Sequence, residues 1–268
     1  MPALDRDGLA EALALGVRAV EAAGAITLEY WRRPDLAVEA KADGSPVTAA
    51  DRAAEREIRA LLKQSAFGGL DVVGEEMGLE GGGSRHYWLI DPIDGTKSFT
   101  RGLPLYGVML ALVDRKAETA LAGVIGLPAL AETYAAARGL GAVCNGETIR
   151  ASAATELAGA VISAPDAHQF RQSGLEAGYR RLRDRVRWLR GYSDCFAHAM
   201  AARGAVDAAL DPSLSPWDAM ASQVIVEEAG GAFLLRKSVE PPGGDGSRLD
   251  VLLGSPPLVD EIARIVDF

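Results

Sequence analysis

The stretch Trp88-Leu89-Ile90-Asp91-Pro92-Ile93-Asp94-Gly95-Thr96-Lys97-Ser98-Phe99 is the most informative segment of the chain. Three apolar residues lead into two carboxylates set three positions apart. Pro92 favours extended backbone at Asp91, and Gly95 permits a positive φ or a close backbone approach. The pattern predicts a strand that ends in a tight turn bearing two carboxylates and a hydroxyl, the oxygen ligands that Mg²⁺ prefers beside a phosphate. A turn capped by Asp94 is the plain structural alternative.

Composition limits the classes of protein to consider. The chain has 268 residues, 49% of them hydrophobic, which is enough for one large domain or two coupled ones. Its net charge of −9 argues against a nucleic acid partner, which needs a basic footprint. No apolar run reaches about 18 residues, so we expect no membrane span, and the charged start lacks the apolar core of a signal peptide. Two cysteines, Cys144 and Cys195, offer no disulfide framework, and a cytoplasmic location is expected.

Two helices are expected at the start of the chain. Apolar residues recur at helical spacing from Leu4 to Trp31, and a second helix should follow Thr48. Thr48 and Asp51 have the spacing of a capping box, which by itself explains Asp51. Lys41, in a short extended piece before this helix, reads as an ordinary surface lysine when taken alone.

Acidic residues also follow a second strand. Residues 70–74 read as a short strand, and Glu75-Glu76 comes directly after it. Two strands that each deliver acid at their C-terminal ends can bring these acids together, although an exposed acidic turn is the alternative. The glycine-rich segment from Gly78 to Ser84 reads as a flexible loop between these strands, placed to move as a lid.

The two halves of the chain differ in their pattern. Strands at 105–113, 120–125, 133–135 and 141–144 follow one another through short turns, one of them Asn145-Gly146, which predicts an antiparallel sheet covered on one face by the two helices. We place a boundary near residue 150, giving subdomains 1–150 and 151–268. In the second half, strands and helices alternate, which predicts a mixed sheet with helices on both faces. Its expected elements are strands at 159–164, 186–190, 205–210, 232–235 and 251–254, helices at 167–184, 193–203, 216–229 and 258–266, and a Pro/Gly-rich surface loop at 237–250.

Ser215-Pro216-Trp217-Asp218 reads as a helix start. Serine is a good N-cap, proline fits the first helical position, and an acid in the first turn is favoured by the helix dipole. Asp218 therefore has a structural explanation independent of function. The three histidines show no ligand spacing, and the six arginines between Arg180 and Arg190 read as a solvated surface.

In combination and order, these segments resemble the inositol monophosphatase family of Mg²⁺-dependent, lithium-sensitive phosphatases. The resemblance rests on W-x-I-D-P-I-D-G-T at 88–96, P-W-D-x-x-A at 216–221, the upstream Glu75-Glu76 pair, Lys41 and Asp51, and it covers nearly the whole chain. It implies an α+β fold of layered αβαβα type with the site between the two halves. It also implies a small phosphorylated metabolite as substrate, two or three Mg²⁺ ions, and the homodimer common among family members.

The resemblance assigns roles to individual residues. The metal ligands it implies are Glu75, Asp91, the backbone carbonyl of Ile93, Asp94 and Asp218. Gly95 and Thr96 match the phosphate-binding turn, and Asp51 with Thr96 matches the pair that positions and deprotonates the attacking water, which Glu75 also orients. Lys41 and Glu76 are expected beside these ligands.

Within the family, the chain looks most like the histidinol-phosphatase branch. Asp194, in Ser193-Asp194-Cys195-Phe196, could pair with the amino group of L-histidinol phosphate, and Asp211 falls where family members contact a substrate hydroxyl or amine. A helix cap is the alternative for Asp194, and Tyr192-Ser193 departs from the Gly-Asp pair expected there. The alternative activities are those of an inositol-1-phosphatase or a broad sugar-phosphate phosphatase, and a nucleotide 3′-phosphatase ranks lower. A regulator that binds a phosphometabolite or a metal without catalysis is the alternative of another class.

Overall fold

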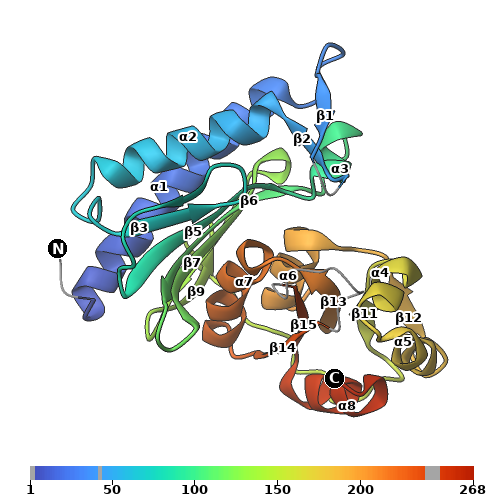
Figure 1. The fold of residues 1–268 in the computed structure, drawn as a ribbon. Helices are drawn as coiled ribbons and strands as arrows, with labels where there is room; N and C mark the ends of the chain where they lie inside the picture. Colours follow the sequence, from blue (N-terminus) through green and yellow to red (C-terminus); the bar gives the residue numbers. More distant parts are fainter. Residues whose placement is uncertain (1–3, 42–43, 239–247) are drawn as a thin grey trace.

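Two β-sheets, one in each half of the chain, organise the fold (Figure 1). The computed structural model describes residues 4–41, 44–238 and 248–268. Most of the Pro/Gly-rich loop expected at 237–250 lies outside the described residues. The first three residues of the charged start and residues 42–43, before the helix at Thr48, lie outside them too.

The N-terminal half forms an eight-stranded sheet in the order β10-β9-β8-β7-β6-β5-β3-β4, with a separate hairpin of β1 and β2. Its neighbouring strands are antiparallel except for the pair β3 and β5. The helices α1 and α2 cover one face of this sheet (Figure 1), which confirms the expected arrangement. The elements are α1 (Arg6–Tyr30), β1 (Val38–Ala40), β2 (Pro46–Thr48), α2 (Ala49–Lys63), β3 (Asp71–Gly74), β4 (Gly78–Glu80), β5 (His86–Asp94), α3 (Thr96–Thr100), β6 (Gly107–Asp114), β7 (Thr119–Leu127), η1 (Pro128–Leu130), β8 (Glu132–Ala137), β9 (Gly141–Cys144) and β10 (Glu147–Thr148).

The C-terminal half forms a five-stranded sheet in the order β12-β11-β13-β15-β14. Strand β11 runs parallel to both of its neighbours, whereas β13, β15 and β14 are antiparallel, so the sheet is mixed as expected. The elements are β11 (Val161–Ser163), α4 (Ala167–Gln172), α5 (Glu176–Arg183), β12 (Trp188–Arg190), α6 (Asp194–Ala202), β13 (Ala208–Leu214), α7 (Pro216–Glu228), β14 (Ala232–Lys237), β15 (Leu249–Gly254) and α8 (Pro256–Val266).

Helices α6 and α7 form the central layer between the two sheets. One buried cluster joins Val224 of α7 and Ala199 of α6 to Ile125 of the first sheet and Leu253 of the second. A second cluster packs α4, α5 and α8 on the opposite face of the second sheet. The order of layers is therefore helix, sheet, helix, sheet, helix, and the predicted αβαβα fold is confirmed (Figure 1).

Local chemistry explains where several elements begin and turn. Asp5 caps α1 by accepting the Gly8 N–H at 3.0 Å. Asn145 and Gly146 both have positive φ, +49° and +84°, which a tight two-residue hairpin of this kind requires and which this pair tolerates. The Asn-Gly signal therefore predicted the connection between β9 and β10 correctly.

Sequence expectations about two segments need correction. The single helix expected at 167–184 is two short helices, α4 and α5, because the chain turns at Gly174 with φ of +74°. The loop expected from Gly78 begins instead as strand β4, paired with β3. The rest of that segment is tethered, since the Asp71 carboxylate accepts the backbone N–H groups of Gly82, Gly83 and Ser84.

Candidate active site

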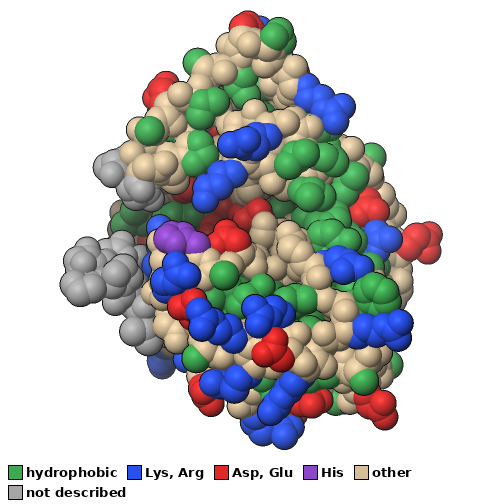
Figure 2. Space-filling model, turned by 90° about the vertical axis from the view of Figure 1, so that its right-hand side faces the viewer, with side chains coloured by type: hydrophobic (Ala, Val, Ile, Leu, Met, Phe, Trp, Pro, Cys, Tyr) green, Lys and Arg blue, Asp and Glu red, His purple; other side chains and the backbone are tan. Residues whose placement is uncertain are grey.

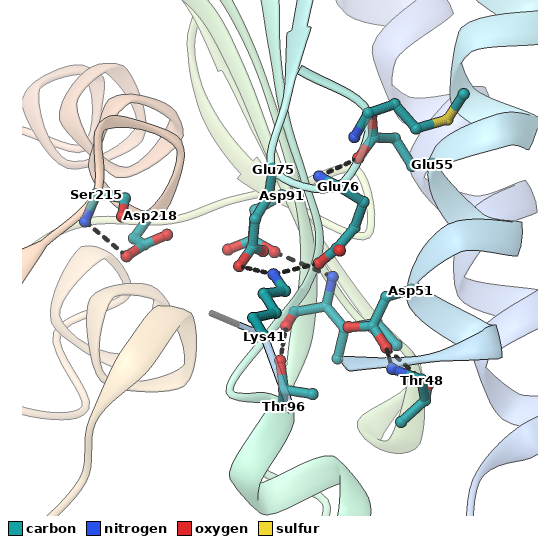
Figure 3. A network of polar contacts seen from close by, with 12 residues as sticks. Lys41, Thr48, Asp51, Glu55, Glu75, Glu76, Asp91, Thr96, Ser215 and Asp218 are labelled. Carbon is teal, nitrogen blue, oxygen red and sulfur yellow. Dashed lines mark hydrogen bonds and ion pairs between the residues drawn. The ribbon is translucent and has the colours of Figure 1, made fainter. Parts of the chain in front are cut away.

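Strands β3 and β5 bring the first two acids of the site together. They are parallel, with Gly74 opposite Ile90, and the N–H of Glu75 donates to the Ile90 carbonyl at 3.2 Å. Because parallel strands end at the same edge of a sheet, Glu75 and Asp91 emerge side by side, as the sequence indicated (Figure 3).

The end of β5 is irregular. The strand continues to Asp94 rather than stopping at Asp91, with a register shift against β6 between these two residues. The Asp91 carboxylate accepts the Ile93 N–H at 3.0 Å, and the Thr96 hydroxyl donates to the Ile93 carbonyl at 2.9 Å. Gly95 has φ of +81°, and a Cβ there would lie 2.9 Å from the Leu105 carbonyl oxygen, so only glycine fits this turn.

Asp218 reaches the site from α7. Ser215 is the N-cap and Pro216 the first helical residue, both as expected, and the Ser215 N–H donates to the Asp218 carboxylate at 2.8 Å. Arg248, which precedes β15, donates to the Ser215 hydroxyl at 2.8 Å. This arginine therefore braces the helix start that carries Asp218.

Three carboxylates gather into one cluster. Asp91, Asp94 and Asp218 each offer a carboxylate oxygen, and these oxygens lie within 4.8 Å of one another. Burial, followed by repulsion from Glu75 at Asp91 and from Asp194 at Asp94, raises the pKa values of these two carboxyl groups well above the ordinary range, and burial raises the pKa of Asp218 to about 7. Asp91 and Asp94 are buried and Asp218 is half-buried, so in their ionised form these carboxylates are stabilised by a cation, and hard oxygen donors of this kind fit Mg²⁺.

Glu75 and Glu76 share a lysine at the edge of this cluster. Lys41 Nζ lies 2.7 Å from Glu75 and 2.5 Å from Glu76 (Figure 3). Burial lowers the pKa of Lys41, but the hydrogen bonds to the two glutamates outweigh this effect and raise the pKa overall. Lys41 is thus part of the site rather than an ordinary surface lysine. Among the described residues, Glu75 is paired with this lysine and is not one of the three clustered carboxylates.

Asp51 has one oxygen committed to its helix and one without a partner. Its Oδ2 accepts the Thr48 N–H at 2.8 Å and the Thr48 hydroxyl at 2.6 Å, so the predicted capping box is confirmed. Within the described part of the chain, the buried Oδ1 has no hydrogen-bond partner. Burial raises the pKa of this carboxyl group. Capping of the helix therefore uses only one carboxylate oxygen of Asp51. The other oxygen, Oδ1, remains able to accept a proton or a hydrogen bond.

Asp194 lies against the Gly95 turn. A Cβ on Gly95 would be 3.4 Å from Asp194 Oδ2, which itself accepts the Ser193 hydroxyl at 2.8 Å. Ser193 is the N-cap of α6, so the alternative that Asp194 caps this helix is wrong. Asp194 is the first helical residue, in left-handed backbone with φ of +58°, and burial, followed by repulsion from Asp211, raises its pKa to about 6.

Asp211 is buried behind Asp194. Its Oδ2 accepts the Asp194 N–H at 3.1 Å and lies 3.4 Å from His198 Nε2. The other ring nitrogen of His198 lies 2.9 Å from the Ser222 hydroxyl. His198 is thus a structural residue of the interior, as its lack of ligand spacing indicated. Next to it, the N–H of Cys195 donates to Asp94 Oδ2 at 2.5 Å, which ties the start of α6 to the carboxylate cluster.

A pocket of about 340 Å³ opens over the carboxylate cluster. Figure 2 shows a hollow between the two halves of the molecule with acidic side chains inside it. Neither Asp194 nor Asp211 is part of the pocket wall. The residues that line the pocket are Lys41, Ser45, Glu75, Asp91, Ile93, Asp94, Gly95, Thr96, Ser215, Trp217, Asp218 and Arg248.

Sequence reasoning missed three contributors to this site. Arg248 lies 30 positions after Asp218 and belongs to no motif. The Cys195 contact uses only the backbone N–H, which carries no signal in residue type. Glu55, which accepts the N–H groups of Glu76 and Met77, lies one helical turn after Asp51, and that spacing is the only sequence signal that could have pointed to it.

Comparisons with known proteins agree with this geometry. The sequence matches the profile of the Inositol monophosphatase family over residues 9–261. It is 41% identical over 229 residues to the histidinol-phosphatase of Chlorobaculum parvum, covering 82% of this chain and 83% of the relative. It is 36% identical over 246 residues to the histidinol-phosphatase of Mycobacterium tuberculosis, covering 90% of this chain and 92% of that relative.

The fold also has close counterparts among solved structures. The extragenic suppressor protein suhB of Bartonella henselae superimposes with a TM-score of 0.83 at 27% identity, covering 96% of this chain and 98% of that protein. Both halves of the fold, the carboxylate cluster and the sequence match lead to the same assignment. The chain belongs to the inositol monophosphatase family and is a metal-dependent phosphomonoesterase of that family.

Proposed function

We propose that the protein hydrolyses L-histidinol phosphate to L-histidinol and phosphate with the help of Mg²⁺. The main support for metal-dependent hydrolysis is the cluster of the buried Asp91 and Asp94 with the half-buried Asp218. A phosphomonoester dianion repels the incoming nucleophile, and bound Mg²⁺ supplies both charge neutralisation and a more acidic bound water. Two or three ions are proposed, held by the cluster together with Glu75 and the Ile93 carbonyl.

Other groups of the chain have defined tasks in this proposal. Gly95 and Thr96 bind the phosphate group, and Asp51 Oδ1, the acceptor without a partner, takes a proton or a hydrogen bond from the attacking water. The Thr96 hydroxyl donates to Ile93 and keeps its oxygen able to accept a second hydrogen bond from that water. Catalysis is then positioning and electrostatic stabilisation without a covalent intermediate.

The substrate assignment rests on charge near the phosphate turn. Asp194 and Asp211 lie behind the Gly95 turn rather than in the pocket wall, and their negative charge favours an ammonium group on the substrate next to the phosphate ester. Relatives that are 41% and 36% identical carry the name histidinol-phosphatase, which supports the same choice. Asp194 and Asp211 remain proposed substrate residues on this basis.

A second candidate is an inositol-1-phosphatase or a broad sugar-phosphate phosphatase. Arg248 favours it, because a guanidinium group in the pocket wall suits hydroxyl groups better than an amine. The non-catalytic regulator is less consistent with the site, since a binder has no need of the water-directed pair Asp51 and Thr96.

The test is a comparison of phosphate release from L-histidinol phosphate and inositol-1-phosphate with saturating Mg²⁺. We expect kcat/KM to be at least about tenfold higher for histidinol phosphate, a difference of about 1.4 kcal/mol in transition-state binding. A preference for inositol-1-phosphate would support the second candidate. If no phosphomonoester released phosphate with Mg²⁺ present, the result would support the non-catalytic regulator instead.

A further inference from the structure

Glu55 is a fully buried carboxylate in the middle of helix α2, one turn after Asp51. Its Oε2 accepts the Glu76 N–H at 2.8 Å, and its Oε1 accepts the Met77 N–H at 3.2 Å (Figure 3). Glu55 therefore bonds the backbone of the turn that presents Glu75 and Glu76, without contacting either carboxylate.

Arg59 completes this contact from the next turn of α2. It is 7% exposed, and its Nε donates to Glu55 Oε1 at 2.8 Å, which balances the buried charge of the carboxylate. Its Nη2 donates to the Gly78 carbonyl at 2.6 Å. Glu55 thus holds the N–H groups at the start of the turn, and Arg59 holds the carbonyl at its end. We name this pair, Glu55 and Arg59, the turn clamp.

Gly74, the last residue of β3, shows how closely the clamp approaches the turn. A Cβ on Gly74 would lie 2.1 Å from Glu55 Oε1, and all three of its nearest neighbours would be carboxylate atoms of Glu55. Gly74 does not have the left-handed backbone that favours glycine. A side chain at this position would therefore displace the Glu55 carboxylate, although the backbone conformation itself does not call for glycine.

The turn needs an external hold because of the charges it carries. Glu75 repels both Glu76 beside it and Asp91 on the neighbouring strand, and this repulsion favours a turn that moves away from the strand ends. Lys41 neutralises part of this charge, but its long side chain does not fix the backbone. The two backbone N–H bonds to Glu55 and the bond from Arg59 to the Gly78 carbonyl, all anchored on a rigid helix, do fix it.

We propose that the turn clamp positions Glu75 for metal binding, together with Glu76 beside it, so that Glu55 and Arg59 act on the site through the backbone of this turn. The inference rests on the proposed function, since it presumes that Glu75 takes part in binding Mg²⁺. Groups that hold metal ligands in place typically change metal affinity by roughly 10- to 100-fold when removed.

The test measures Mg²⁺ affinity directly, by calorimetric titration of the substrate-free protein. We expect Glu55→Gln, Arg59→Met and Gly74→Ala each to weaken binding by roughly tenfold or more. In turnover assays, these variants should need correspondingly more Mg²⁺, while kcat at saturating Mg²⁺ stays within about threefold of wild type. A merely structural role would lower thermal stability without moving the Mg²⁺ requirement.

Two further variants make the test specific. Leu62→Ala leaves a cavity on the same helix and destabilises the fold without touching the turn, and it should keep wild-type Mg²⁺ affinity. In the double variant Glu55→Ala/Gly74→Ala, the added methyl group lies where the carboxylate was. Its Mg²⁺ affinity should equal that of Glu55→Ala alone, because both changes remove the same contact.

The possible results separate the clamp from the proposed function. Unchanged Mg²⁺ affinity in Glu55→Gln and Gly74→Ala would refute the role of the turn clamp but not the proposed function. An equal loss in Leu62→Ala, or a loss in the double variant that multiplies the two single effects, would also overturn it. Wild-type protein that binds no Mg²⁺ would refute the proposed function, and the clamp with it.

Discussion

Asp94 serves two parts of the molecule with one carboxylate. Its Oδ2 accepts the Cys195 N–H at the start of α6, while the group also belongs to the cluster with Asp91 and Asp218. An asparagine at this position can still accept the Cys195 N–H through its amide oxygen, but it loses the charge. The two tasks of Asp94 can therefore be separated by one substitution.

Asp94→Asn should lower phosphate release at least about 100-fold, which corresponds to about 2.7 kcal/mol of lost charge stabilisation. The melting temperature without metal should not fall, because the change removes a buried carboxylate whose pKa burial raises. Steady-state kinetics and thermal melts check both statements. Asp184→Asn, on an exposed helix end, is the matched control and should behave like wild type. Unchanged turnover in Asp94→Asn would refute the metal assignment.

Asp194 is where substrate selectivity can be measured. Asp194→Asn keeps the size of the side chain but removes the charge that would pair with an amino group. We expect kcat/KM for L-histidinol phosphate to fall at least about tenfold, and kcat/KM for inositol-1-phosphate to change less than about threefold. Equal losses for both substrates would show that Asp194 only supports the fold of the α6 start.

The sequence predicted the clustered acids but not every partner of them. The tight turn with its two carboxylates pointed to Asp91 and Asp94, whereas Asp218 read only as a first-turn acid of a helix until the family resemblance assigned it to the site. Arg248 left no such signal and Glu55 only its spacing from Asp51, since each reaches its partner through a contact between distant segments. Local patterns do not encode contacts of this kind.

At the level of elements, helix α7 connects the core to the site. A Cβ on Gly123 of β7 would lie 2.5 Å from the Ala221 carbonyl oxygen and 2.7 Å from Val224 Cγ1, so this glycine allows α7 to pack closely on the first sheet. Asp218 is on the first turn of the same helix. Any displacement of α7 therefore changes the position of Asp218 relative to Asp91 and Asp94.

Gly123→Ala should destabilise the protein by about 1–3 kcal/mol through overpacking and should also reduce activity, because α7 shifts. Urea unfolding and steady-state kinetics measure the two effects. Gly159→Ala is the matched control, since a Cβ there meets nothing within 4 Å, and it should leave activity unchanged. A Gly123→Ala protein with wild-type stability and turnover would contradict this account of the α7 contact.

Elements with strong periodicity were predicted well, and short irregular ones were not. Helices α1 and α2 and the strands of the first sheet fall close to their expected ranges. The break at Gly174 was missed because a single glycine within an otherwise helical segment does not by itself end a helix, and its positive φ is not visible in the sequence. Strand β4 was missed because its glycine-rich sequence is typical of a loop, and only pairing with β3 makes it a strand.

For the whole molecule, the order of layers followed from the family resemblance rather than from local patterns. Periodicity predicted two sheets and the faces that helices cover, but not that α6 and α7 lie between the sheets. The expectation that no helix spans a membrane is consistent with the described residues, among which no helix is long and apolar enough. The six arginines between Arg180 and Arg190 lie in the α5–β12 region, and several pair with acids at the surface, among them Arg180 with Glu176.

The charge cluster makes the stability of the whole molecule depend on pH and on metal. The pKa of Asp218 is raised from 3.8 to about 7 and that of Asp194 to about 6, in both cases chiefly by burial. Between about pH 4 and pH 7, the folded chain therefore binds more protons than the unfolded chain, and stability must fall as the pH rises. Bound Mg²⁺ compensates the ionised carboxylates.

We expect the melting temperature in EDTA to fall by about 5 °C or more from about pH 5 to about pH 8, and most of this fall to disappear with saturating Mg²⁺. Differential scanning calorimetry in both conditions provides the measurement. Asp218→Asn should show a smaller fall in EDTA than wild type. A melting temperature in EDTA that stays level or rises over this range would contradict the raised pKa values.

The central claim is that carboxylates from two halves of the chain bind Mg²⁺ and that hydrolysis of a phosphate ester requires this ion. The most direct measurement is phosphate release from L-histidinol phosphate as a function of Mg²⁺ concentration, starting from protein treated with EDTA. The account predicts no release without Mg²⁺ and a saturable increase as the ion is added. Full turnover in EDTA, or no turnover at any Mg²⁺ concentration, would contradict it.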